Sequence, residues 1–421
     1  MAVDKRGKQA KRKCQTKKAK RGKEIVKQTD WSKLPHAVLL HLFQYLPHAD
    51  KYHAAQTCKT WLQPMSEPSL FQTGHFRFDS VGVNRAITYV KVRGKLLRHI
   101  KVDCSVSINY QPQTRAMYQF LVNLLNSGND QLLTLSLTNT WHLNEGIEYP
   151  RSMLVQLMAA VLTSQQQLRA LDLCSANVSV DQGRDLLEAA SRNSAYTVHK
   201  LAIVDLIRNF RGDVDLRRSP KLIAAMCNFP NLRELDLNND YLTDELLDRL
   251  AETTKSLQVM TVNANDYLKA WSRTTPPAWQ KLRSFCCQLK VVFLIKPKTG
   301  YYFDPALMGL LTPSTPLHTL DWTSGELISL DHIKQCFQHI ATHFQNSIRH
   351  LKFQSAVRLD SSDIGMLFES IHTCRYLKTL SISLKCDLSG DDKFYKTAIQ
   401  DAVDVHRMTC AVTFNGQTMK S

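Results

Sequence analysis

Cysteine and histidine are the residues of this chain that could ligate a metal or act as nucleophile and base. The 11 cysteines contain no C-x-x-C pair, and only Cys286 and Cys287 are adjacent. The 15 histidines show no spacing that would gather two of them with carboxylates around a metal ion. Walker, G-x-G-x-x-G, G-x-S-x-G and H-E-x-x-H motifs are absent as well. The residue types therefore predict no catalytic centre, no metal and no cofactor, and we expect a non-catalytic protein that works by binding.

Positive charge is concentrated at the start of the chain. Residues 5–23 are crowded with Lys and Arg and contain no acid, in a protein whose net charge is +17. Because this stretch has few apolar side chains to bury, residues 1–29 are predicted to be a disordered basic tail. A nuclear-localisation signal is one reading of it, and its candidate residues are Lys11, Arg12, Lys13, Lys17, Lys18, Lys20 and Arg21.

Two other readings of the tail stay open, namely non-specific nucleic-acid contact and a solvated tail without a partner. No aromatic side chain interleaves the basic residues, and the rest of the chain is only mildly basic. Nucleic acid is therefore not an expected partner of the whole protein. The basic start is not followed by an apolar segment typical of a secretion signal, and no run of about 18 apolar residues exists. We expect no membrane span, reduced thiols and a location in the cytoplasm or nucleus.

Residues 34–61 are predicted to form short helices with more apolar surface than their own core needs. Two stripes recur at helical spacing: Val38, Leu42 and Tyr45 in one, and Leu39, Phe43 and Leu46 in the other. A surface helix needs only one such stripe to face its own core. Helices this short barely support an independent core, which takes roughly 40 residues. A partner helix laid against the surplus face would resolve both problems.

The order of these residues resembles the F-box: Leu34-Pro35, Val38-Leu39, Leu42-Phe43, Leu46, Asp50, Cys58 and Trp61 carry the resemblance. It implies docking on the Skp1 adaptor of a cullin-based ubiquitin ligase. The Skp1-binding residues that it implies are Leu34, Pro35, Val38, Leu39, Leu42, Phe43, Leu46 and Trp61. The sequence departs from the family at His36-Ala37 and Lys51-Tyr52, which we expect at the polar fringe of the docking face, where they would weaken binding. The alternative is an ordinary amphipathic helical hairpin.

A short pattern, L-x-x-L-x-L, recurs along the rest of the chain at intervals of roughly 31 residues. It begins at Leu97, Leu132, Leu168, Val198, Leu232, Leu257, Leu289, Leu317, Ile348 and Leu377. Helical patterns lie between the starts, as in residues 244–251. One strand and one helix per period resembles the leucine-rich-repeat family. The resemblance implies an α/β fold, with the N-terminal helical F-box followed by a curved solenoid of parallel strands inside and helices outside.

The predicted organisation has four parts: a basic tail at 1–29, the F-box at 30–78, an irregular leucine-rich-repeat solenoid at 79–390 and a C-terminal cap at 391–421. This combination resembles F-box proteins with degenerate repeats, of the F-box only protein thirty-nine type. It implies a substrate-recognition subunit of a Skp1–cullin–F-box ubiquitin ligase, with cullin and RING subunits reached through Skp1 and an unknown protein as substrate. The alternative is a non-ligase repeat scaffold with a nuclear or nucleic-acid-binding tail.

The third, fifth and seventh positions of each repeat are expected to point to the concave face, where a target would bind. The candidate substrate-binding residues are Asp172, Glu234 and Asp236, the apolar rung Val291, Phe293 and Ile295, and Lys352. An exposed apolar rung beside charges is typical of a recognition site. The alternative is that the adjoining residues 301–303 fold over this rung and bury it.

Overall fold

The computed structural model describes residues 30–79, 82–104, 110–140, 151–207, 219–264, 274–296, 311–327, 330–356, 373–385, 411–414 and 417–420. The chain divides into two compact units, Met1–Leu70 and Phe71–Ser421. The predicted basic tail, the loop at residues 301–303 and most of the predicted C-terminal cap lie outside the described residues.

The first unit is helical. Its described elements are α1 (His36–Tyr45), α2 (His48–Ala55), α3 (Lys59–Leu62) and the 3-10 turns Trp31–Lys33, Gln63–Ser66 and Pro68–Phe71. α1 ends at Tyr45, because Leu46 precedes Pro47 and takes an extended conformation with ψ 140°. A residue before proline is disfavoured from the helical region by its clash with the proline ring. The buried apolar side chains of the unit are Leu39, Phe43, Ala55, Met65 and Leu70.

The second unit contains one sheet whose strands follow the order of the chain. Its strands are β1 (Thr73–Arg77), β2 (His99–Asp103), β3 (Thr134–Thr138), β4 (Ala170–Asp172), β5 (Lys200–Ala202), β6 (Glu234–Asn238), β7 (Val259–Ala264), β8 (Lys290–Ile295), β9 (Leu317–Leu327), β10 (His350–Ala356), β11 (Thr379–Lys385), β12 (Ala411–Phe414) and β13 (Gln417–Lys420). Neighbouring strands pair in parallel, except β12 with β13. β1, which the sequence assigned to the end of the F-box, pairs with β2 and so belongs to this sheet.

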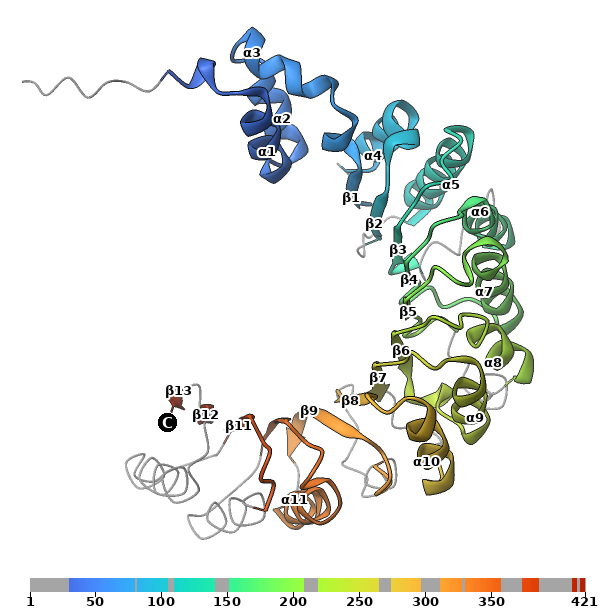
Figure 1. The fold of residues 1–421 in the computed structure, drawn as a ribbon, viewed down its shortest axis with the longest axis vertical. Coiled ribbons are helices and arrows are strands. Elements are labelled where there is room, and N and C mark those ends of the chain that lie inside the picture. Colours follow the sequence, from blue (N-terminus) through green and yellow to red (C-terminus); the bar gives the residue numbers. More distant parts are fainter. Residues whose placement is uncertain are drawn as a thin grey trace, which may run out of the picture. The chain divides into compact units, whose positions relative to one another are not determined.

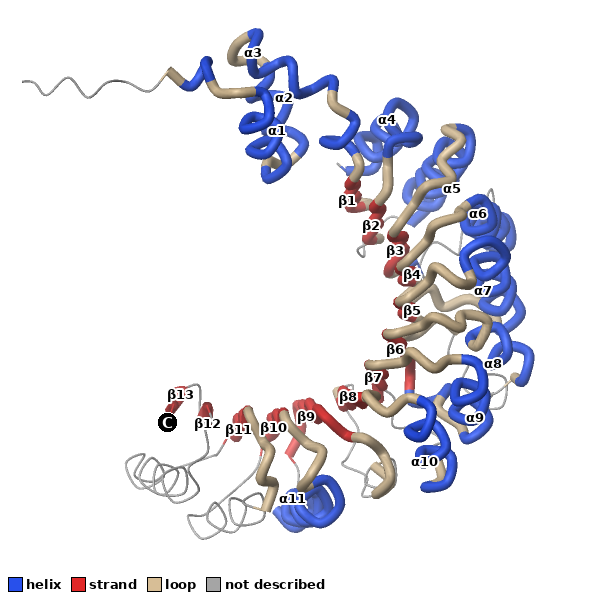
Figure 2. Tube along the Cα trace, in the orientation of Figure 1, coloured by secondary structure: helices blue, strands red, loops and turns tan. Residues whose placement is uncertain are grey.

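Parallel neighbours need crossover connections, and helices supply most of them here. The helices of this unit are α4 (Gly82–Arg93), α5 (Tyr110–Asn126), α6 (Arg151–Ser164), α7 (Val180–Ser194), α8 (Pro220–Met226), α9 (Asp244–Thr253), α10 (Pro276–Phe285) and α11 (Leu330–Phe344). They lie on one side of the row of strands (Figures 1 and 2). Alternate strand side chains and the apolar faces of the helices form one continuous core. We call the side of the sheet away from these helices the open face.

The ten predicted repeat starts fall at or just before β2 to β11. In all of these strands except β8, the fourth and sixth residues of the L-x-x-L-x-L pattern are buried, on the side opposite the predicted concave-face positions. In β8 the prediction is wrong by one residue. Val291, Phe293 and Ile295 are completely buried, and Val292 and Leu294 lie on the open face instead. All five residues from 291 to 295 are apolar, so the sequence has no alternation that would fix which set points inward. A slip of one residue moves every side chain to the other face.

Candidate functional site

α1 is apolar on two sides, and only one of them faces the core of its own unit. Leu39 and Phe43 are buried, whereas Val38 and Leu42 keep 43% and 44% of their surface exposed and Tyr45 keeps 75%. Residues spaced by four and three positions line up on one side of a helix. Val38, Leu42 and Tyr45 therefore make an exposed apolar stripe, which we call the α1 stripe. A contiguous apolar surface of this kind marks an interaction site.

The other predicted Skp1-binding residues lie around the α1 stripe in different environments. Pro35 is exposed at the N-cap of α1, and Leu34 and Leu46 are half-buried. Leu39 and Phe43 are buried in the core of the unit. The prediction that they contact a partner directly is therefore wrong, and they instead pack beneath the α1 stripe.

Trp61 is half-buried and ties α3 to the rest of the unit. Its indole Nε1 donates a hydrogen bond to the Trp31 carbonyl at 3.0 Å. Its ring meets Phe43 edge-on, with 5.9 Å between the ring centroids. Sequence reasoning did not include Tyr45 among the binding residues, although its helical spacing to Val38 and Leu42 was the signal that could have placed it there.

Of the departures from the F-box pattern, Lys51 does not lie at the fringe of a docking face. Its side chain is buried, with 6% exposed, and its Nζ donates to the Leu70 carbonyl at 3.0 Å. Burial in the helical unit lowers the pKa of Lys51. His36 does lie at the surface, where its Nε2 is 3.4 Å from the Glu67 carboxylate.

Acidic side chains gather on the open face of the second unit, as the sequence predicted for Asp172, Glu234 and Asp236. Asp172 and Asp236 stand in one row across β4, β5 and β6, with Ala202 between them. Glu234 accepts from Lys200 Nζ at 2.6 Å. Burial raises the pKa of Asp236, and the negative charges of Glu234 and Asp172 raise it further. A hydrogen bond from Thr261 and the positive charge of Lys200 lower it, but the net shift is upward. This cluster suits a cationic group.

The apolar rung of the open face lies beside a charged row. Leu294 of β8 pairs with Asp321 of β9, which pairs in turn with Lys352 of β10. Lys352 Nζ lies 3.2 Å from the Asp321 carboxylate, so the predicted basic residue is on the open face and pairs there with a carboxylate. Lys296 Nζ lies 4.0 Å from the same carboxylate. On β8, the residues of this face that could contact an apolar side chain are Val292 and Leu294.

The cysteines and histidines singled out in the sequence were also placed in the structure. Across the described ranges no three His, Cys, Asp or Glu side chains are gathered as metal ligands. Burial raises the pKa of Cys227 and of Cys336 to about 12, which keeps these thiols protonated at neutral pH. Among the described helices, none has the length and apolar character needed to span a membrane.

Comparison with known proteins matches a family model to most of the described first unit and to the first residues of the second. Residues 31–77 match the F-box-like family. F-box/LRR-repeat protein 21 of Mus musculus is 23% identical over 306 residues, which cover 69% of this chain and 64% of that protein. The protein of the same name from Ovis aries is 24% identical over 235 residues, 53% of this chain and 49% of that one. The chain thus spans about half to two thirds of the length of these curated relatives.

A solved structure also aligns, that of D-psicose 3-epimerase with D-tagatose from Clostridium cellulolyticum H10. It is 11% identical over 60% of this chain and 92% of that one, but its TM-score of 0.18 carries no argument about the fold. The finer likeness to the F-box only protein thirty-nine type stays a prediction. The exposed stripe on α1 thus belongs to an F-box-like domain at residues 31–77, in a chain homologous to F-box/LRR-repeat protein 21.

Proposed function

We propose that this protein is a substrate-recognition subunit of a Skp1–cullin–F-box ubiquitin ligase. The observation that carries the proposal is the α1 stripe: Val38, Leu42 and Tyr45 stay exposed in a domain whose own core is filled by other residues. Skp1 covers this stripe, with Pro35 and the half-buried Leu34 and Leu46 at its border. Covering the stripe stabilises the complex by on the order of 1 kcal/mol per side chain, because each is already partly buried.

The second unit supplies the target-binding surface in this proposal. Its repeating strand–helix units support a curved leucine-rich-repeat solenoid, and neighbouring repeats bury the apolar faces that one repeat could not bury alone. The target protein binds the open face, with its basic groups at Asp172, Glu234 and Asp236 and its apolar groups at Val292 and Leu294. Lys352 borders that surface and pairs with Asp321.

The contribution to ubiquitination is proximity rather than chemistry. Skp1 connects the domain to cullin and RING subunits, and the repeats hold the target. Tethering raises the local concentration of target lysines near the conjugating enzyme's active site. The protein needs no catalytic residue of its own for this role.

Co-purification of Skp1 and cullin with the full chain tests the proposal. Leu42→Glu places a charge in the α1 stripe without touching the buried core. Val92→Glu is the matched control, because Val92 of α4 is also exposed, at 69%, but lies in the other unit. Wild type and Val92→Glu are expected to recover Skp1 and cullin, and Leu42→Glu to lose most of both. Equal recovery by all three proteins, or none by wild type, contradicts the proposal.

The basic run at residues 5–23 supports a second candidate, a non-ligase repeat scaffold that enters the nucleus or contacts nucleic acid through this tail. That candidate predicts no Skp1 in the co-purification. It predicts instead salt-sensitive nucleic-acid binding that is lost on deletion of residues 1–27. In either role we propose a location in the cytoplasm or nucleus, with residues 11–21 as the import signal.

A further inference from the structure

Four Ser or Thr residues of this chain stand directly before a proline, and the structure places them in different environments. They are Ser219, Thr275, Thr312 and Thr315. Thr315 is buried, with 2% of its surface exposed, and Ser219 and Thr312 are half-buried. Thr275 is the exposed member of the set. A proline-directed protein kinase selects a hydroxyl by the proline that follows it, so the fold leaves Thr275 as the accessible acceptor for such an enzyme.

The backbone at Thr275 already has the extended form that a kinase cleft accepts. Thr275 has φ −89° and ψ 151°, and Pro276 holds it there, because the proline ring clashes with a helical residue before it. Thr275 is the N-cap residue of α10, but its side chain forms no capping hydrogen bond, and its hydroxyl has no partner among the described residues. The neighbouring Thr274 is buried, and its Oγ1 accepts from the Trp279 indole at 2.7 Å. Thr274 therefore anchors this segment, and the hydroxyl of Thr275 stays available for reaction.

Few backbone hydrogen bonds hold this segment, so a kinase can draw it into its cleft. Pro276 and Pro277 have no N–H to donate. The bond from Trp279 N to the Thr275 carbonyl, where α10 starts, is long at 3.4 Å. The shorter contact is the one that Thr275 N donates to Asp244 Oδ1 at 2.7 Å. Access to the hydroxyl therefore requires these contacts to open, without unfolding of the rest of α10.

We propose that Thr275 is a phosphorylation site for a proline-directed protein kinase, a modification that goes beyond the proposed ligase role. Thr275 Oγ1 attacks the γ-phosphorus of the ATP that the kinase holds. The new bond between this oxygen and phosphorus forms as the bond from phosphorus to the oxygen shared with the β-phosphate breaks, and ADP leaves. The hydroxyl proton passes to the catalytic aspartate of the kinase.

The phosphate on Thr275 stands beside a carboxylate. Asp244 Oδ1 is 2.7 Å from the backbone N of the same residue, so the two negative groups lie close together and repel each other. A phosphate at a helix N-terminus is usually favoured by the free N–H groups there. In α10 the first two of these positions are Pro276 and Pro277, which have none. Repulsion therefore outweighs the helix dipole, and phosphorylation weakens the contact between the starts of α9 and α10.

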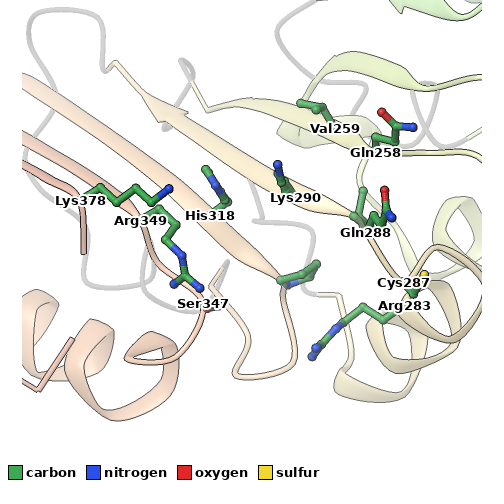
Figure 3. Close-up of a pocket in the computed structure, with 12 residues that line it drawn as sticks. Gln258, Val259, Arg283, Cys287, Gln288, Lys290, His318, Ser347, Arg349 and Lys378 are labelled. Carbon is green, nitrogen blue, oxygen red and sulfur yellow. The ribbon is translucent and has the colours of Figure 1, made fainter. Parts of the chain in front are cut away.

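The basic side chains of the described helices α9 and α10 are engaged elsewhere. They are Arg249, Lys281 and Arg283. Arg249 and Lys281 pair with carboxylates of α9. Arg283 stands eight positions after Thr275, about 12 Å along the helix. It lines a pocket of about 550 Å³ at the edge of the sheet where the strands begin (Figure 3). These side chains therefore leave the charge of the phosphate unneutralised.

The test of the site uses the full-length chain, radiolabelled ATP with Mg²⁺, and an active mitogen-activated protein kinase, which is proline-directed. Wild type is expected to be labelled, with tandem mass spectrometry placing the phosphate on Thr275. Thr275→Val is expected to lower the label roughly tenfold, because the other three acceptors become accessible only when the fold opens locally. Thr315→Val is the matched control, since Thr315 also precedes a proline but is buried. Its label is expected to equal that of wild type.

Two kinds of result overturn Thr275 as the site. One is a wild-type chain that takes up no label. The other is a phosphate found on Ser219, Thr312 or Thr315 with Thr275 unmodified, or label that Thr275→Val and Thr315→Val retain equally. The mapping on wild type decides this even if a variant folds poorly.

Thermal unfolding of the phosphorylated and unphosphorylated chains tests the effect of Asp244. Phosphorylation is expected to lower the Tm of wild type by roughly 1–2 °C. Asp244→Asn keeps an oxygen that can accept from Thr275 N but removes the charge, so phosphorylation is expected to lower its Tm by clearly less. An unchanged or raised Tm in phosphorylated wild type, or an equal decrease in Asp244→Asn, overturns the repulsion between the phosphate and Asp244.

Discussion

Val292 and Phe293 are neighbours in β8 that face opposite sides of the sheet. Phe293 is completely buried, while Val292 is half-exposed on the open face. Phe293→Ala is therefore expected to lower the free energy of unfolding by about 3–5 kcal/mol, because it leaves a cavity in the core. Val292→Thr, on the open face, should change it by about 0.5 kcal/mol or less. Urea denaturation measures both changes. A larger loss of unfolding free energy in Val292→Thr than in Phe293→Ala would contradict the burial of Phe293 and support the strand register expected from the sequence.

Asp236 gives the open face a pH-dependent contribution to stability. Burial is the main cause that raises the pKa of Asp236 in the folded protein above 3.8, its ordinary value. Between 3.8 and the raised pKa, the folded protein therefore binds the proton more tightly than the unfolded chain does. Stability from this group therefore falls as pH rises through that window. Asp236→Asn lacks the titration, so its free energy of unfolding should rise relative to that of wild type as pH increases from about 3.8 through the raised pKa. Chemical denaturation from pH 4 to 7 checks this, and a constant or shrinking difference contradicts it.

Residue types alone could place Asp172, Glu234, Asp236 and Lys352 on the open face, because they alternate with buried leucines. The same reasoning failed at β8, where five consecutive apolar residues remove the alternation. It also failed at Lys51, whose charge suggested the surface, whereas its long side chain reaches a carbonyl inside the unit.

α7 shows how local sequence sets an element's boundary. Ser179 Oγ accepts from Gln182 N at 3.2 Å, and the Gln182 side chain accepts from Ser179 N at 3.1 Å, so the helix begins with a capping box. Ser179→Ala is expected to lower the free energy of unfolding by about 1 kcal/mol, measured by urea denaturation. Ser179→Asp keeps a cap and should cost much less. Equal losses in the two variants would mean that the cap is not what stabilises this end.

Elements were predictable wherever their apolar period is regular. The repeat pattern marked β2 to β11, because it follows from local rules of packing. The end of α1 before Pro47 follows from an equally local steric rule. The place of β1 in the sheet was not predictable, because its pairing with β2 depends on contacts that no local pattern contains.

The candidate sites of the whole molecule were only partly visible in the sequence. The α1 stripe lies within one helix, so helical spacing reveals it. Basic residues stand at or near the strand start in eight of the ten repeats, mostly about 30 positions apart in the sequence, and they become one edge only when the strands align. A basic residue after the first leucine of successive repeats, as in Leu97-Arg98 and Leu232-Arg233, was the available signal. The pocket also needs Arg283 from α10, which no repeat position indicates.

The affinity of the full chain for purified Skp1 tests the central claim most directly. Wild type and Val92→Glu are expected to bind with dissociation constants within twofold of each other. Leu42→Glu is expected to bind at least tenfold more weakly, because a charge cannot be covered by an apolar partner surface without a large desolvation cost. No binding by wild type, or equal binding by Leu42→Glu and Val92→Glu, would contradict the α1 stripe as the Skp1-docking surface.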